Sequence, residues 1–224
     1  NFTKNLAINV GIDASKIKVI FPGINKPKKI DIKYKKEAEK IFGDSHPKII
    51  TVARLDKRKG HDKILMVIKN LKIKFPKIKY ISVGFGDEER NLKKLAKELE
   101  IENDVTFLKY HDEDIKLALI EKSNLFLMPS RIEKKSVEGF GISFMEAASY
   151  GVGSIGGKDG GASDAISHNK SGLICDGNDL GSIYESVMYF FENDKYKEFG
   201  KTALKISENF HWKKIVKDYL KLIN

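Results

Sequence analysis

Short apolar runs alternate with amphipathic helical patterns along most of this chain. The strand-like runs, of four to six residues each, lie at 18–21, 48–53, 80–83, 105–108, 125–128, 153–156 and 172–175. Between them, apolar residues recur at helical spacing, as at Ile64, Ile68, Leu71 and Phe75, and Pro76 ends that pattern. Right-handed crossovers put helices on both faces of a parallel sheet. The alternation therefore predicts an α/β fold with a doubly wound, Rossmann-like parallel sheet.

The two ends of the chain differ from this alternating middle. Residues 1–26 contain a helical pattern, a glycine and the run at 18–21, and a lysine-rich linker with Pro27 follows. The last segment, 209–224, carries an apolar stripe at helical spacing. We therefore expect one domain over 27–208, entered through 1–26 and followed by a separate helix. The N-terminal segment reads like the middle of a longer protein and has no signal-peptide pattern.

Basic residues outnumber acidic ones, and this bears on the choice of partner. The chain has 41 Lys and Arg against 31 Asp and Glu, a net charge of +10 and a pI near 9.4. Such a balance favours nucleotides, nucleic acid or acidic membranes, although lysines spread over helix surfaces would also produce it. No RNA- or DNA-binding motif accompanies the charge, so nucleic acid is not an expected partner. The single cysteine, Cys175, excludes an internal disulfide and suits a reducing compartment such as the cytoplasm.

Several common catalytic and cofactor motifs are absent. The P-loop, the GxGxxG fingerprint, HExxH and CxxC do not occur, and no apolar run approaches the length of a membrane span. Five histidines lack metal-ligand spacing and are more typical of surface or packing positions: His46, His61, His111, His168 and His211. We therefore expect neither a metal nor a bound cofactor.

Two glutamates flank a glycine-rich turn. Glu138 and Glu146 have seven residues between them, and the turn at 139–141 follows the first directly. The buried run before them ends at Pro129, so we expect Glu138 in a strand-to-helix loop and Glu146 in the next helix. Ligands of open α/β sheets bind at the carboxyl ends of the strands. Glu146 therefore suits a ribose diol and Glu138 the hydroxyls of a second sugar, unless both are simply solvated.

Two further strand-to-helix loops have features of a ligand site. Arg54 and Lys59 bracket the loop after 48–53, where their charges can converge with a helix N-terminus on one anion such as pyrophosphate. Gly84 opens the loop after the next strand, where a glycine lets a ligand approach the backbone. A solvated basic loop and a sterically required glycine are the plain alternatives for these two loops.

Together these pieces occur in an order and spacing that one enzyme family shares. The matching positions are 52–55, 59–60, 84–88, 129–130, 138–147 and 160–161. They resemble the retaining glycosyltransferases of the two-domain GT-B fold, in the branch called group 1 or family 4. The resemblance covers residues 18 to about 176. It identifies the chain as the C-terminal, donor-binding half of such an enzyme, a hexosyltransferase.

The resemblance implies a role for each matching residue. Arg54 and Lys59 would bind the donor diphosphate and stabilise it as the leaving group, so that no metal is needed. Glu138 would hold the donor sugar and complete the catalytic set, while Glu146 would hold the nucleotide ribose. The other donor-binding positions that it implies are Gly84, Ser130, Gly139, Phe140, Gly141 and Ile142. The sugar would be transferred with retention at the anomeric carbon and without a protein nucleophile.

Residues 138–166 are most similar to the bacterial phosphatidylinositol mannosyltransferase branch. This makes GDP-mannose the expected donor, with a UDP-sugar as the other choice, and a glycan or lipid-linked molecule the expected acceptor. Two positions depart from the family pattern: Gly153 stands where proline is common, and Asp164 stands where glutamate is usual. Specificity among nucleotide sugars depends on contacts that this pattern does not contain.

The family also has an N-terminal acceptor domain, which would precede residue 1. On this basis residues 1–26 would lead out of that domain, 27–208 would form the nucleotide-sugar-binding domain, and the helix at 209–224 would pack back toward the first domain. The chain alone would bind a nucleotide weakly and transfer no sugar. We expect a cytoplasmic protein, with peripheral contact at the inner face of the membrane.

Two other interpretations stay open. Nucleotide-sugar 2-epimerases and glycogen phosphorylases share this architecture, but an epimerase needs further acid and base residues, and the lysine setting of a phosphorylase cofactor site is not recognisable. A non-catalytic basic module that recruits acidic lipid or nucleic acid would instead bind polyanions in a salt-sensitive way. That module would also be indifferent to Glu146→Ala.

Overall fold

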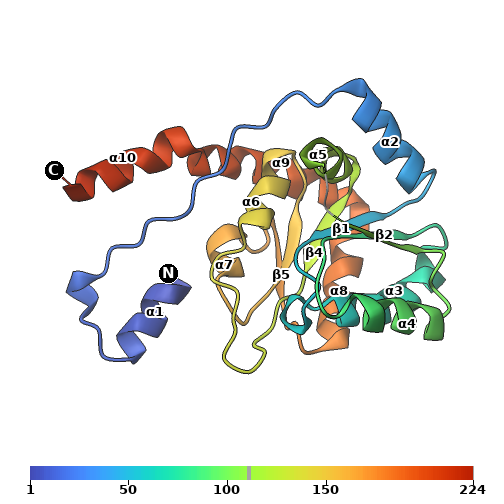
Figure 1. The fold of residues 1–224 in the computed structure, drawn as a ribbon, viewed down its shortest axis with the longest axis horizontal. Helices are drawn as coiled ribbons and strands as arrows, with labels where there is room; N and C mark the ends of the chain where they lie inside the picture. The colour runs from blue at the N-terminus through green and yellow to red at the C-terminus, as the bar shows by residue number, and fades with distance from the viewer. Residues whose placement is uncertain (110–111, 224) are drawn as a thin grey trace.

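A computed structural model describes residues 1–109 and 112–223 of the protein. Its centre is one six-stranded sheet, parallel throughout, with the strand order β3-β2-β1-β4-β5-β6 (Figure 1). The strands are β1 Lys48–Val52, β2 Lys79–Val83, β3 Val105–Leu108, β4 Leu125–Met128, β5 Ser154–Gly157 and β6 Gly172–Cys175. The predicted doubly wound α/β fold is confirmed, and these strands lie within one residue of the predicted runs.

Helices follow the strands as the sequence predicts. The α-helices of the described residues are α1 Phe2–Asn9, α2 Ile32–Phe42, α3 His61–Lys74, α4 Glu89–Glu98, α5 Glu113–Lys122, α6 Ile142–Ser149, α7 Ala162–Ala165, α8 Leu180–Phe191, α9 Lys195–Ser207 and α10 Trp212–Ile223. Short 3-10 helices are η1 Ala14–Lys16, η2 Lys57–Lys59, η3 Glu192–Asp194 and η4 Glu208–Phe210. Within these ranges, every helix is too short or too polar to cross a bilayer.

The predicted strand at 18–21 is wrong. No strand is present there, because the stretch has no neighbour with which to form a ladder: the sheet ends at β3 on one side and at β6 on the other. Its last residue, Phe21, packs instead on side chains of other segments. The ring stacks on Phe140 with the centroids 5.2 Å apart and lies 5.7 Å from the ring of Phe210.

Backbone hydrogen bonds join residues 23–24 to residues 210–212, far apart in the sequence. The backbone N–H of Ile24 donates to the carbonyl of Phe210 (2.8 Å), and that of Trp212 donates to the carbonyl of Ile24 (3.0 Å). Gly23 lies under the indole of Trp212, where an added Cβ would come within 2.4 Å of the ring. We refer to this contact of residues 23–24 with residues 210–212 as the clasp.

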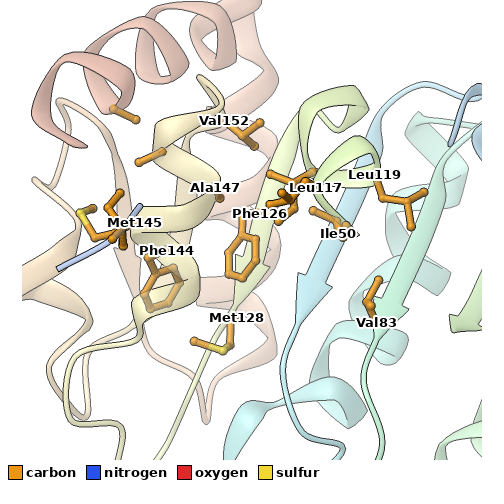
Figure 2. Close-up of a cluster of buried hydrophobic side chains, with 14 of the residues drawn as sticks. Ile50, Val83, Leu117, Leu119, Phe126, Met128, Phe144, Met145, Ala147 and Val152 are labelled. Atoms are coloured by element: carbon orange, nitrogen blue, oxygen red, sulfur yellow. The ribbon is translucent and has the colours of Figure 1, made fainter. Parts of the chain in front are cut away.

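Successive residues of each strand supply the cores on the two faces of the sheet. On β1, Ile49 and Ile50 are both fully buried, yet they belong to different clusters, because side chains alternate across a strand. The cluster that contains Ile50 packs α2, α5 and α6 against one face (Figure 2), and the other packs α3, α4 and α8 against the opposite face. All of β4 is buried, which accounts for its uninterrupted apolar sequence.

The order of the strands reverses beside β1. Strands β2 and β3 lie on one side of it, and β4, β5 and β6 lie on the other. Loops that leave the two strands at such a switch point diverge toward opposite faces of the sheet, and ligands bind between them. Here the loops are residues 53–60 after β1 and residues 129–141 after β4, the two segments in which the sequence places its charged candidates.

Candidate functional site

The loop after β1 and the loop after β4 are in contact. Gly60, directly after η2, has a φ of +79°, and an added Cβ would lie 2.6 Å from the carbonyl oxygen of Pro129. Both the backbone angle and the close approach therefore require glycine. Further along, the backbone N–H of Arg131 donates to the carbonyl of Arg58 (2.9 Å). These contacts hold the basic loop against the loop that carries Glu138.

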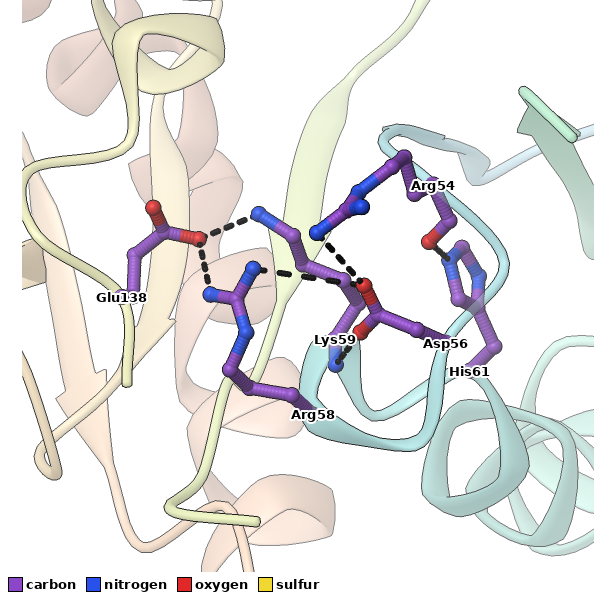
Figure 3. A network of polar contacts seen from close by, with 6 residues as sticks. All are labelled: Arg54, Asp56, Arg58, Lys59, His61 and Glu138. Carbon is purple, nitrogen blue, oxygen red and sulfur yellow. Dashed lines mark hydrogen bonds and ion pairs between the residues drawn. The ribbon is translucent and has the colours of Figure 1, made fainter. Parts of the chain in front are cut away.

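Glu138 forms a buried cluster of ion pairs with two basic residues of η2 (Figure 3). The Nη1 atom of Arg58 lies 3.0 Å from Glu138 Oε2, and the Nζ atom of Lys59 is paired with the same oxygen. The three side chains are between 10% and 12% exposed. We refer to these residues as the Glu138 cluster. A buried charge is costly unless it is paired, so the carboxylate and the two cations depend on one another.

Glu146 lies on α6 and has a cationic partner on α5. The Nζ atom of Lys116 is 3.2 Å from Glu146 Oε1 and 2.9 Å from Glu113 Oε1, and its side chain is only 7% exposed. Burial alone would lower the pKa of Lys116, but the carboxylates of Glu146 and Glu113 outweigh burial and hold that pKa above its ordinary value. The lysine is therefore a fixed positive charge beside Glu146.

Three cavities open beside these carboxylates, and two of them share Ser143. The Glu138 cavity, of about 600 Å³, is bounded by the N-terminal segment on one side and on the other by Lys59, Glu138, residues 139–143 and Asp164. The Glu146 cavity, of about 430 Å³, is lined by residues 52–54, residues 83–85, Glu113, Lys116, Ser143 and Glu146. Ser143, in the first turn of α6, lines both cavities. The N-terminus of α6 thus lies between them.

Arg54 and Lys59 face different cavities in this structure. Arg54 lines the Glu146 cavity with a side chain that is 70% exposed, and its Nη2 atom lies 3.5 Å from the carboxylate of Asp56 (Figure 3). Lys59 lines the Glu138 cavity. Asp56 connects the two, because its Oδ1 atom accepts a hydrogen bond from the backbone N–H of Lys59 (3.2 Å). A joint role of the two cations on one anion stays a prediction.

The other predicted donor-binding residues occupy several settings. Gly84 lines the Glu146 cavity, and its missing side chain is a packing requirement, because a Cβ would lie 1.9 Å from the carbonyl oxygen of Ala53. The turn from Gly139 to Ile142 lines the Glu138 cavity. Ser130 is fully buried and lines neither cavity, and its hydroxyl has no hydrogen-bond partner among the described residues. The ligand contacts assigned to these positions stay predictions.

Two residues of the site were not singled out from the sequence. Arg58 and Lys116 are single basic residues among 41, and each meets its glutamate only after folding. The described residues, which do not include His111, contain no group of three or more His, Cys, Asp or Glu side chains that could hold a metal ion. Cys175 is buried at the end of β6, and burial raises its pKa to about 12, so it is no nucleophile.

His61 holds the basic loop in place through a hydrogen bond to its backbone. It is the first residue of α3 and is 1% exposed, so it is a packing residue. Its Nε2 atom lies 3.2 Å from the carbonyl oxygen of Arg54, to which the neutral ring donates, and its Nδ1 atom faces the hydroxyls of Tyr80 (3.0 Å) and Ser82 (3.3 Å). Burial lowers the pKa of His61 to about 4, which keeps the ring neutral at physiological pH.

The lowered pKa of His61 predicts that the protein loses stability in mild acid. The folded state takes up its proton only near pH 4, whereas the unfolded chain takes it up near pH 6.5, so the free energy of unfolding falls as the pH drops through that window. Between pH 7 and about pH 4.5 the wild-type protein should lose roughly 2 to 3 kcal/mol more than the His61→Gln variant. Urea unfolding at both pH values measures this difference, and equal losses in the two proteins would contradict it.

Comparison with known proteins finds relatives in sequence and in fold. The family model "Glycosyl transferases group 1" matches residues 32–206. A GDP-mannose-dependent alpha-(1-6)-phosphatidylinositol monomannoside mannosyltransferase of Mycobacterium tuberculosis is 32% identical over 143 residues, which are 63% of this chain and 37% of that protein. An uncharacterised glycosyltransferase of Methanocaldococcus jannaschii is 27% identical over 224 residues, 98% of this chain and 55% of that protein.

A solved structure has the same fold. The crystal structure of Anabaena HepE in complex with UDP and glucose superposes with a TM-score of 0.84 at 20% identity, over 99% of this chain and 60% of that one. The chain thus spans from about a third to three fifths of the length of these proteins. With the family model matched over most of its length, the chain belongs to the group 1 glycosyltransferases, and its sheet is that of the C-terminal half of the GT-B fold.

Proposed function

We propose that this chain binds a nucleoside diphosphate sugar for metal-independent, retaining glycosyl transfer. The observation that carries the proposal is the pair of cavities that share Ser143. A nucleotide sugar has a hydroxyl-rich group at each end of a diphosphate. The Glu146 cavity offers a carboxylate for the ribose, and the Glu138 cavity offers a carboxylate for the sugar.

The diphosphate would lie between the cavities, at the N-terminus of α6. The first backbone N–H groups of a helix have no partner within it and carry partial positive charge, so this end favours an anion. Lys59, on the Glu138 side, and Arg54, on the Glu146 side, would add full charges from the facing loop. As the bond between the anomeric carbon and the phosphate oxygen breaks, these groups would stabilise the negative charge that collects on the leaving diphosphate.

Glu138 would serve as a clamp for sugar hydroxyls and not as a nucleophile. Its Oε2 atom is already engaged by two cations, which lowers its electron donation toward an anomeric carbon. The acceptor hydroxyl would instead attack the face from which the diphosphate leaves and pass its proton to that leaving group. Retention follows because the bond forms on the face at which the other breaks.

GDP-mannose is the donor that we propose, by analogy with the mycobacterial relative, whose name specifies it. A UDP-sugar is the competing donor, because HepE was crystallised with UDP and glucose. The acceptor, a glycan or a lipid-linked molecule, the transfer reaction of a complete enzyme, and a cytoplasmic location with contact to the membrane surface are further parts of the proposal.

The Glu146→Ala variant tests the proposed orientation of the donor. It should weaken the binding of GDP and UDP by roughly 10- to 100-fold, since a charge-assisted hydrogen bond contributes roughly 1.5 to 3 kcal/mol, but leave inorganic pyrophosphate binding unchanged. Calorimetry with the three ligands measures both effects. The Glu185→Ala variant, which removes an exposed glutamate on α8, is the control. Equal weakening of nucleotides and pyrophosphate would contradict the assignment, as would a wild-type protein that binds neither nucleotide at millimolar concentration.

A further inference from the structure

Arg58 is the member of the Glu138 cluster that borders neither cavity. Its side chain is 10% exposed, and it lines neither the Glu138 cavity nor the Glu146 cavity. Its Nη1 atom is 3.0 Å from Glu138, its Nη2 atom is 4.0 Å from Asp56, and its carbonyl accepts from Arg131. A donor in either cavity would therefore not touch this arginine, and its charge is committed to the protein.

Lys59 differs from Arg58 in one respect that matters for binding. Both cations pair with the same oxygen of Glu138, but Lys59 also lines the Glu138 cavity. A lysine ammonium is a point charge on a flexible stem, whereas an arginine guanidinium is a rigid fork that suits a permanent buried pair. When a diphosphate enters, Lys59 can turn toward it only by giving up part of its contact with Glu138.

The departure of Lys59 would leave a buried carboxylate in need of a cation. Loss of one partner from a buried ion pair is strongly unfavourable, because the remaining charge has neither water nor counter-charge. We propose that Arg58 is a positioning residue that keeps Glu138 neutralised and in place while Lys59 is transferred to the donor diphosphate. This inference rests on the proposed function, since it assumes a diphosphate beside Lys59.

If Lys59 moves from Glu138 to the diphosphate, Arg58 is needed for ligand binding only as long as Glu138 carries a charge. In the Arg58→Gln variant, Lys59 is the remaining partner of Glu138, and a diphosphate must compete with that carboxylate for it. We expect about a tenfold weaker affinity for UDP, GDP and pyrophosphate. Removing the carboxylate as well, in Arg58→Gln/Glu138→Gln, frees Lys59, so the affinity for these ligands should return to that of Glu138→Gln alone.

Calorimetry on the 224-residue chain, with UDP, GDP and pyrophosphate as ligands, tests this rescue. Lys57→Gln is the matched control, because it removes an exposed cation from the neighbouring position and should bind like the wild type. A merely structural role of Arg58 predicts that the double variant stays as weak as Arg58→Gln, and that result would overturn the inference. Unchanged binding by Arg58→Gln would overturn it too.

Further outcomes distinguish a failure of the role of Arg58 from a failure of the proposed function and from a folding defect. If the wild-type chain binds none of the ligands, the proposed function fails, and the role of Arg58 fails with it. If the wild type binds and only the rescue is missing, the role of Arg58 alone is rejected. Should Arg58→Gln not fold, the double variant, which has no buried carboxylate to neutralise, is compared directly with Glu138→Gln, and a more than threefold difference in affinity overturns the inference.

Discussion

Replacing Lys59 with alanine is expected to weaken binding of GDP, UDP and pyrophosphate by roughly 10- to 100-fold, the effect of losing one charge-assisted contact to phosphate. Lys59 is the largely buried cation that lines the Glu138 cavity and is paired with Glu138. Its loss removes a charge from the proposed diphosphate site and leaves the carboxylate, which repels an anion, with Arg58 as its partner. Both effects reduce the affinity for a diphosphate.

Titration calorimetry of the variant with each of the three ligands measures this loss. Lys57→Ala is the control with the same change of net charge, two positions away and exposed. If Lys57→Ala and Lys59→Ala weaken binding to the same small extent, the effect is a general one of charge, as a polyanion-binding module would show. Unchanged binding in Lys59→Ala would rule out the proposed diphosphate position.

Replacing Phe144 with alanine is expected to destabilise the fold by about 3 to 5 kcal/mol, the cost of deleting a buried aromatic side chain and leaving a cavity. The ring is fully buried, and it packs edge-on against Phe126 of β4 with the centroids 5.5 Å apart (Figure 2). It also lies under Gly141, where an added Cβ would come within 2.6 Å of it. Phe144 thus fixes the start of α6 on the sheet.

Urea unfolding followed by circular dichroism gives the free energy of unfolding of this variant. Ile73→Ala, a truncation at an α3 position that is 86% exposed, should change that free energy by no more than about 0.5 kcal/mol. A Phe144→Ala protein as stable as the Ile73→Ala protein would show that α6 is held by other contacts. Because Glu146 lies on the same helix, the variant should also bind nucleotides less well.

The strands could be predicted because each buried strand is a short, continuous run of mostly apolar residues in the sequence. Strand β4, with all four residues buried, is an apolar run that stops at proline. The run at 18–21 has similar composition but finds no neighbour in the sheet, and this depends on the arrangement of the whole domain. The expected division at residues 26 and 208 stays a prediction, although the family match over 32–206 lies inside it.

The site could be predicted only in part. Glu138 and Glu146 were found because a glycine turn and a helix separate them in one continuous segment. Their partners come from 80 and 30 residues away in sequence, respectively, and a lysine or arginine in so basic a chain carries no local signal. Arg54 and Lys59 line different cavities, with Asp56 near the Arg54 guanidinium and accepting from the backbone N–H of Lys59, and their convergence on one anion stays a prediction.

The clasp also decides what the intrinsic fluorescence of this chain can report. Trp212 is the single tryptophan, and its half-exposed indole lies on Gly23 in the clasp. No indole lies in the two cores of the sheet. A change in emission therefore signals movement of the entering segment against α10, and it can occur while the sheet is still folded. The tryptophan is a reporter of the clasp, and the sheet needs a different probe.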